Sequence, residues 1–305
     1  MIDISIIIVN YKVKDYLITC IKSILGQNLN KLSIEIIVVD NNSNDGSIEA
    51  IKEKFPEIKL IINKRNKGFS KAINQGSLIA KGEFLFLLNP DTLLIDNFFS
   101  PIINFIKEDS DIAIIGPTLV NEENKIEQSF WKKPTLLNTI LSITHLDFLN
   151  LRRNYFSYNY KTSKLVDTIS GGAFLVRSSI FKSMKGFDSN LFWMEDVDFC
   201  LRVSRLGYKI FYYPFVKIIH FKGKSSLTNY KIVIINQLIS KIKFFKKHHS
   251  RNQILLLKIS IFLISLFKSA LLLLVIINPK NLEKLKAHIF VMSSILNNKI
   301  NTIVT

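Results

Sequence analysis

Through the first 90 residues, short and continuously apolar runs alternate with stretches in which apolar residues recur at helical spacing. Continuous apolar runs without polar alternation are typical of parallel strands that helices cover on both faces. The pattern therefore predicts an α/β fold with a mostly parallel sheet. The expected strands are 4–10, 34–40, 58–63 and 83–88, and the expected helices end near residue 26 or begin near residues 44 and 67.

Polar residues stand where two of these strands end. Asp40 closes the second strand, and Asn89 and Asp91 follow the fourth. Ligands of open α/β sheets bind just beyond the carboxyl ends of the strands, so we expect these side chains to face one crevice. There Asp40 could accept the ring N–H of a pyrimidine base. Pro90 favours an extended Asn89, and Asp91 then offers a hard oxygen ligand for Mg²⁺ or Mn²⁺. A capped β-to-α turn at 40–47 and a plain Pro-Asp turn remain as alternatives.

Three carboxylates open a predicted helix in the second half of the chain. Glu195, Asp196 and Asp198 stand at its start, where the helix dipole favours acids, so capping alone would account for them. Phe192 and Trp193 directly precede them, however, and an apolar wall raises the pKa of a carboxyl group toward the range of a general base. This arrangement favours a functional role.

Two basic segments that contain glycine suit a phosphate. Gly68 opens a helix within 63–76, and the backbone N–H groups at such a helix start favour anions. This segment lacks both the G-x-G-x-x-G and the G-x-x-x-x-G-K-[ST] pattern, so it supports neither a dinucleotide dehydrogenase nor a P-loop enzyme. His220 ends an apolar run and precedes the basic loop 222–224. A solvated basic turn and a structural histidine are the alternatives that each motif leaves open by itself.

The net charge of +17 is unevenly distributed. Residues 231–305 hold 12 lysines and arginines against one acid, a net +11, which leaves 29 basic and 23 acidic residues, a net +6, before them. This shift predicts two domains, 1–230 and 231–305, and an anionic partner for the second. No nucleic-acid reading motif accompanies the basic residues.

Residues 254–278 form an apolar stretch long enough to span a bilayer. Lys258 and Lys268 interrupt it, and a lysine at the centre of a spanning helix costs about 2.5 to 3.5 kcal/mol. On a helix these lysines share one polar stripe with Ser265 and Ser269. Together with the basic and aromatic segment before it, the stripe predicts a helix that lies in the plane of an anionic leaflet. A single span, a buried packing layer and a homodimer interface are the alternatives.

The cysteines and the N-terminus suggest a reducing compartment. Cys20 and Cys200 lie far apart in apolar periodic segments, so neither a disulfide framework nor a thiolate metal site is expected. The first residues carry an acid, Asp3, and no basic leader, which does not match a signal peptide. They predict a first strand instead.

Taken in order, these motifs resemble family 2 glycosyltransferases of the GT-A fold, particularly the bacterial rhamnosyltransferase-like branch. The resemblance covers about residues 3–230, and its joint order is far more specific than any single motif. The matching segments are "SIIIVNYK", "EIIVVDNNSNDGS", "NKGFSKAINQG", "FLFLLNPDT", "GGAFLVRSSIF", "GFDSNLFWMEDVDFCLR" and "HFKGKSS".

The resemblance implies an inverting transfer of a sugar, with rhamnose expected, from a nucleoside-diphosphate sugar to a lipid-linked saccharide of cell-surface polysaccharide synthesis. The expected donor is dTDP-rhamnose, with a UDP-sugar as the alternative, and the expected location is the cytoplasmic face of the bacterial inner membrane. Nucleotide binding is implied for Asn10, Asp40, Asn66, Gly68 and Asn89. Binding of Mg²⁺ or Mn²⁺ is implied for Asp91 and His220, and catalysis for Asp196, as the base, with Glu195.

The sequence departs from the family pattern at two points. Asn89 replaces the first acid of the Asp-x-Asp metal motif and offers a ligand oxygen with less charge. The Q-x-x-R-W motif of processive synthases is absent, because Gln128 is followed by Ser129, Phe130 and Trp131, which favours a single transfer. Two other functions stay open: a non-catalytic binding subunit, which has little reason to keep five polar site residues, and a polyprenyl-phosphate sugar synthase, whose membrane helices should be cleaner spans.

Overall fold

The computed structural model describes residues 2–95, 97–144, 146, 160–221, 230–275 and 277–301. The chain divides into two compact units. The first unit comprises Met1–Lys133, Asn159–Ser189 and Glu195–Ser225, and the second comprises Pro134–Tyr158, Asn190–Met194 and Ser226–Thr305. The basic loop 222–224 and most of the aromatic-rich stretch before residue 160 lie outside the described residues.

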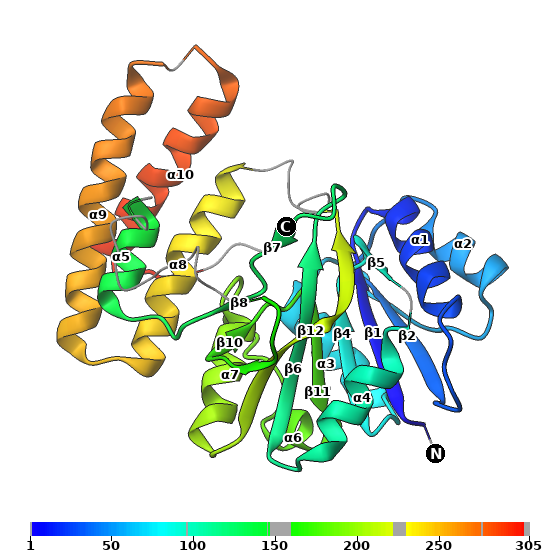
Figure 1. The fold of residues 1–305 in the computed structure, drawn as a ribbon. Helices are drawn as coiled ribbons and strands as arrows, with labels where there is room; N and C mark the ends of the chain where they lie inside the picture. Colours follow the sequence, from blue (N-terminus) through cyan, green and yellow to red (C-terminus); the bar gives the residue numbers. More distant parts are fainter. Residues whose placement is uncertain are drawn as a thin grey trace. The chain divides into compact units, whose positions relative to one another are not determined.

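A parallel half-sheet forms first along the chain, as the apolar runs predict (Figure 1). Its strands run in the spatial order β3 (Lys59–Ile62), β2 (Ile34–Asp40), β1 (Ile4–Asn10) and β4 (Phe84–Leu88). The helices that connect them are α1 (Lys14–Leu25), α2 (Ser47–Lys54) and α3 (Phe69–Ile79). Every residue of β1 and β4 is buried, which confirms that helices and loops cover both faces of these strands.

The sheet continues with strands from the second half of the chain, in the order β11, β6, β12 and β5 after β4. β11 (Ala173–Arg177) runs antiparallel between β4 and β6 (Ile112–Val120), β12 (Lys209–His220) runs parallel to β6, and β5 (Thr92–Leu94) runs antiparallel to β12. The short strands are β7 (Ile126–Glu127) on β6, β9 (Lys164–Leu165) on β12, and the separate pair β8 (Phe130–Trp131) and β10 (Thr168–Ile169). The sheet is therefore mixed, and its antiparallel members bring late segments next to early ones.

Three further helices belong to the first unit: α4 (Phe99–Glu108), α6 (Ser178–Ser183) and α7 (Glu195–Arg205). Phe98 and Phe99, at the start of α4, pack against Phe86 of β4 with ring centroids 5.1 and 6.1 Å away. Both cysteines are free and buried, as the sequence predicts. Burial raises the pKa of Cys20 to about 12, so its thiol packs as a small apolar group.

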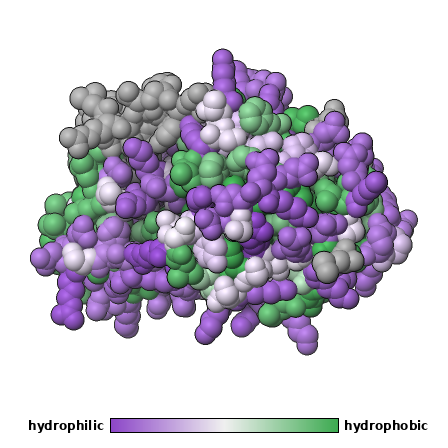
Figure 2. Space-filling view, turned by 60° about the horizontal axis from the view of Figure 1, so that its bottom comes forward, coloured by the Kyte–Doolittle hydropathy of each residue, from purple (hydrophilic) through white to green (hydrophobic). Residues whose placement is uncertain are grey.

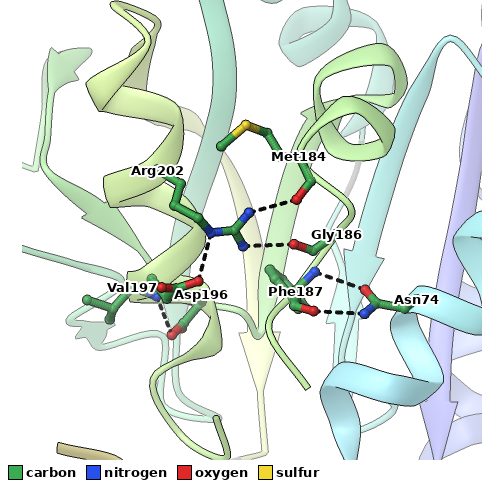
Figure 3. A network of polar contacts seen from close by, with 8 residues as sticks. Asn74, Met184, Gly186, Phe187, Asp196, Val197 and Arg202 are labelled. Atoms are coloured by element: carbon green, nitrogen blue, oxygen red, sulfur yellow. Dashed lines mark hydrogen bonds and ion pairs between the residues drawn. The ribbon is translucent and has the colours of Figure 1, made fainter. Parts of the chain in front are cut away.

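A polar clamp fixes α7 within the first unit. Figure 3 shows Arg202 of α7 donating to the carbonyl oxygens of Met184, at 2.9 Å, and Gly186, at 2.7 Å. Arg202 Nε also donates to the fully buried Asp198 at 2.8 Å. Asn74 of α3 pairs with both backbone groups of Phe187 at 2.8 and 2.9 Å. Segment 184–187 is thus bound from two helices.

The second unit is a bundle of α5 (Leu136–Thr144), α8 (Tyr230–His248), α9 (Arg251–Leu273) and α10 (Pro279–Leu296). Of the described helices, α9 alone is long and apolar enough to cross a membrane, by length and composition. The hydrophobic core of the bundle is formed by side chains such as Ile239, Phe245, Ile261 and Val291.

The polar stripe of α9 lies on the inner side of this helix. Ser265 is fully buried, and its hydroxyl lies 3.2 Å from Nδ1 of His288 on α10. Lys268 Nζ donates to the carbonyl oxygen of Ile143 on α5 at 3.1 Å. Ser265 and Lys268 therefore make polar contacts inside the bundle, while the apolar side of the helix remains outward.

Candidate active site

The carboxyl ends of β1 and β2 form the first part of the site. Asn10 and Asp40 are register partners, and Asn10 Nδ2 donates to Asp40 Oδ1 at 2.8 Å and to Ser43 Oγ at 2.9 Å. Ser43 donates to Asp40 through its backbone N–H and its hydroxyl, at 3.0 and 2.5 Å. All three residues are buried. Asn10 Oδ1 has no hydrogen-bond partner among the described residues, which leaves an acceptor at this strand end.

A second turn adjoins these strand ends at the start of α3. Gly68 takes a φ of 80°, a conformation that favours glycine, and its N–H donates to the side chain of Asn66 at 2.9 Å. Asn41, which follows Asp40, donates to the Gly68 carbonyl at 3.4 Å. Through this contact the structure brings the Asn66–Gly68 turn to the end of β2.

Asp91 and His220 meet because β12 pairs with β5. His220 pairs with Thr92 in this register, and the N–H of the next residue, Phe221, donates to the Asp91 carbonyl at 2.9 Å. His220 Nε2 lies 3.6 Å from Asp91 Oδ1, too far for a hydrogen bond. Asp91 Oδ1 is buried and has no hydrogen-bond partner within the described part of the chain. An oxygen in this situation suits a bound cation.

One carboxylate beside His220 was not predicted from the sequence. Glu127, at the end of β7, places Oε2 3.7 Å from His220 Nδ1. No sequence signal marks it, because its strand has only two residues and the position of the glutamate depends on pairing with β6. His220 therefore lies between two acids.

The turn between β10 and β11 joins the cation end of the site to Asp196. The Gly172 carbonyl accepts from the Asn89 N–H at 3.0 Å, and the Gly171 N–H donates to Asp196 Oδ2 at 2.8 Å. A Cβ at Gly172 would lie 3.5 Å from Asn89 Nδ2 and 3.8 Å from His220. In the sequence, the only mark of this turn is a pair of adjacent glycines immediately before a buried strand.

Asp196 lies in the first turn of α7 and is half-buried. Burial raises the pKa of its carboxyl group, although N–H groups of Gly171 and Val197 oppose this effect. Val197 N–H donates to Asp196 Oδ1 at 2.7 Å. Glu195, directly before it, is buried. A carboxyl group with a raised pKa and fixed orientation has the properties of a general base.

The ligand atoms at Asp91 and His220 show whether the site fits a divalent cation. Carboxylate oxygen and imidazole nitrogen are acceptable ligands for Mn²⁺ or Mg²⁺, and Asp91 Oδ1 is available as described above. Within the described ranges, His, Cys, Asp and Glu side chains form no group of three or more able to hold a metal by themselves. Asp91 and His220 fit a cation that takes its other ligands from a phosphate group or from water.

Fold and site together define the class of protein. Two solved structures share the fold. The structure of GalNAc-T7 with UDP, GalNAc and Mn²⁺ has a TM-score of 0.61 and 17% identity, and the match covers 81% of this chain and 48% of that chain. The structure of the mannosyltransferase PcManGT from Pyrobaculum calidifontis in complex with GDP-Man and Mn²⁺ has a TM-score of 0.57 and 16% identity, and the match covers 97% of this chain and 87% of that chain. The protein is a glycosyltransferase of the GT-A fold, as predicted.

The model of glycosyl transferase family 2 matches residues 5–184, and the chain belongs to this family. One curated relative is the N-acetylglucosaminyl-diphospho-decaprenol L-rhamnosyltransferase of Mycobacterium tuberculosis (strain ATCC 25618 / H37Rv). It is 24% identical over 212 residues, which are 63% of this chain and 68% of the relative. The predicted similarity to rhamnosyltransferases is thus confirmed.

Proposed function

We propose that the protein transfers a sugar, rhamnose, from dTDP-rhamnose to a lipid-linked saccharide, with inversion at the anomeric carbon and one transfer per encounter. The observation that carries this proposal is the single Gly-Gly turn, which binds Asp196 on one side and Asn89, next to Asp91 and His220, on the other. A base and a cation site that one turn connects suit the attack of a hydroxyl on a sugar diphosphate.

Nucleotide recognition is assigned to the ends of β1 and β2. Asp40 holds Asn10 by a hydrogen bond of 2.8 Å, and Asn10 Oδ1 remains an acceptor without a partner among the described residues. We assign Asp40 and Asn10 to the ring N–H of a pyrimidine base, because that group is a donor. The Asn66–Gly68 turn and Asn89 are assigned to the nucleoside.

Asp91 and His220 are assigned as the residues that would hold Mn²⁺ or Mg²⁺ for the diphosphate of the donor. When bound, such a cation would neutralise the charge that develops on the departing nucleoside diphosphate. The contribution of the chain is to fix the two ligands: Asp91 is 3% exposed and His220 13% exposed in their side chains, and both are held by the pairing of β12 with β5.

Asp196 is assigned as the base that accepts the proton of the acceptor hydroxyl as its oxygen attacks the anomeric carbon. Direct displacement inverts that carbon. Glu195 precedes Asp196 at the start of the same helix and is assigned a supporting role. The missing Q-x-x-R-W pattern at Gln128–Trp131 supports a single transfer.

Calorimetric titration of the purified protein tests the donor site without knowledge of the acceptor. We would titrate dTDP, UDP and GDP, each with Mn²⁺ and again with a chelator. The expected result is selective binding of dTDP that weakens on chelation. Asp91→Asn should remove the metal effect, while Glu122→Gln, an exposed acid outside the site, should not. Absence of binding by all three nucleotides in folded protein would overturn the proposal.

We also propose that the outward side of α9 attaches the protein to the cytoplasmic leaflet. From Leu255 to Leu273 every exposed residue is apolar: Leu255, Leu256, Ile259, Leu263, Leu266, Phe267, Ala270, Leu271 and Leu273. Figure 2 shows hydrophobic surface (green) beside hydrophilic surface (purple) on the face that it draws. Exposed Lys246 and Lys247 in the last turn of α8 and exposed Arg251 at the start of α9 complement anionic headgroups. In this proposal Lys258 and Lys268 face the bundle instead of the lipid.

Flotation with vesicles of phosphatidylglycerol and phosphatidylcholine tests the attachment. The double variant Leu263→Asp/Leu266→Asp changes residues that are 57% and 51% exposed, so we expect loss of flotation without loss of stability. The matched control is Leu78→Asp, because Leu78 is 82% exposed in α3 of the first unit. If the double variant floats like the wild type, or if the control is lost as well, the assignment of α9 is wrong.

A further inference from the structure

His220 is held between two carboxylates that approach its two ring nitrogens. Nε2 faces Asp91 Oδ1 at 3.6 Å, and Nδ1 faces Glu127 Oε2 at 3.7 Å. The three side chains come from segments far apart in the sequence, and each is less than one-fifth exposed. The two nitrogens therefore have different neighbours, although both neighbours are acids.

A neutral imidazole carries its proton on one nitrogen and a lone pair on the other. The nitrogen next to Asp91 needs its lone pair if it is to contact a cation there. The other nitrogen must then carry the proton, and the group that faces it should be an acceptor. Glu127 Oε2 is such an acceptor, and its atom, like His220 Nδ1, is buried from solvent.

We propose that Glu127 is a positioning residue, which accepts the Nδ1 proton of His220 and so fixes the tautomer that directs the Nε2 lone pair toward Asp91. Acids that orient metal-binding histidines in this way are frequent in metalloproteins. The metal-binding consequence rests on the proposed function, but the tautomer itself does not, since it is a property of the chain without any ligand.

The local structure supports this role for Glu127. β7 pairs antiparallel with β6, so that Glu127 stands opposite Leu119, and β12 pairs parallel with β6, so that Ile218 also stands opposite Leu119. β6 thus lies between the two strands and fixes Glu127 and His220 relative to each other. A distance of 3.7 Å is slightly longer than a hydrogen bond, and a small rotation of either side chain closes it.

The first experiment measures the tautomer directly. Protein with ¹⁵N-labelled imidazole rings is examined by long-range ¹H–¹⁵N correlation without metal; the chain has five histidines, and His220→Gln assigns the signal. We expect the proton on Nδ1 in the wild type and in Glu127→Gln, whose amide oxygen still accepts. We expect redistribution toward Nε2 in Glu127→Leu, with the exposed Glu122→Leu as the matched control.

The second experiment measures Mn²⁺ binding by electron paramagnetic resonance, with Mn²⁺ alone and with dTDP. Loss of an orienting partner typically weakens metal binding about 10- to 100-fold, so we expect this loss for Glu127→Leu and a smaller one for Glu127→Gln. A wild-type proton on Nε2, or a Glu127→Leu variant with unchanged tautomer, would overturn the inference. An unchanged Mn²⁺ affinity in that variant would overturn its metal-binding consequence. If the tautomer behaves as expected but the wild type binds no Mn²⁺, the positioning role stands and the proposed metal site fails.

Discussion

Replacement of Arg202 by methionine should destabilise the first unit and slow sugar transfer together. Arg202 makes three charged hydrogen bonds, to Asp198 Oδ2 at 2.8 Å and to the carbonyl oxygens of Met184 and Gly186 at 2.9 and 2.7 Å. Asp198 is fully buried, and the Arg202 side chain is 17% exposed. Methionine keeps the aliphatic part of the side chain but leaves the buried carboxylate without its guanidinium.

The loss of stability expected for Arg202→Met follows from this uncompensated charge on Asp198. Removal of one partner of a buried ion pair costs about 3 to 5 kcal/mol, and because Arg202 is partly exposed we expect the lower end, about 3 kcal/mol. The double variant Asp198→Asn/Arg202→Met should recover part of this loss, since it removes the charge as well. Arg205→Met, an exposed arginine three residues along the same helix, should cost less than about 0.5 kcal/mol.

The assay is denaturant unfolding of all three variants, followed by sugar-transfer kinetics for those that remain folded. Because Arg202 binds the segment that Asn74 also holds, its loss should loosen the start of α7 and lower kcat more than donor affinity. A cost below about 1 kcal/mol, or a cost equal to that of Arg205→Met, would refute the reasoning that the clamp fixes α7.

Three further predictions concern the site itself. Asp196→Asn should lower kcat about 10² to 10⁴-fold with nearly unchanged donor binding by calorimetry, and near-normal turnover would contradict its role as base. Burial raises the pKa of Asp196, so its base form is lost as pH falls through a value above the ordinary carboxyl pKa of about 4. The acid limb of the plot of kcat/KM against pH should therefore lie above about pH 4. An acid limb at or below that pH would exclude Asp196 as the base. Gly172→Ala adds a methyl group 3.5 Å from Asn89 Nδ2 and Ser170 Oγ, an ordinary contact distance that the fold tolerates. Because this methyl group narrows the space beside Asn89, nucleotide affinity should fall without a change in melting temperature, whereas Gly26→Ala, outside the site, should leave affinity unchanged.

Much of the first half of the fold could be predicted from local pattern. The strands expected at 4–10 and 34–40 are β1 and β2 with the same bounds, and the strand expected at 83–88 begins one residue later. The strong signal comes from burial on both faces, which leaves no polar alternation to confuse with a surface strand. The polar ends of these strands, Asp40 and Asn89, were visible for the same reason.

The order of the strands from the second half of the chain could not be predicted from local pattern. β11 enters the sheet antiparallel between β4 and β6, and β12 pairs with both β6 and β5, and no local pattern specifies such pairings. The stripe of α9 illustrates the same limit, because periodicity placed its lysines and serines on one side of the helix but did not reveal that this side faces α5 and α10.

The sequence by itself determined the family, the parallel half of the sheet and the identity of the polar residues at its edge, because these depend on neighbouring residues and on short motifs. Tertiary structure alone decided that His220 lies between Asp91 and Glu127 and that one Gly-Gly turn binds both Asn89 and Asp196. Strand register between distant segments sets these contacts, and the free energy that selects a register comes from burial of the whole sheet, which no short stretch of the chain contains.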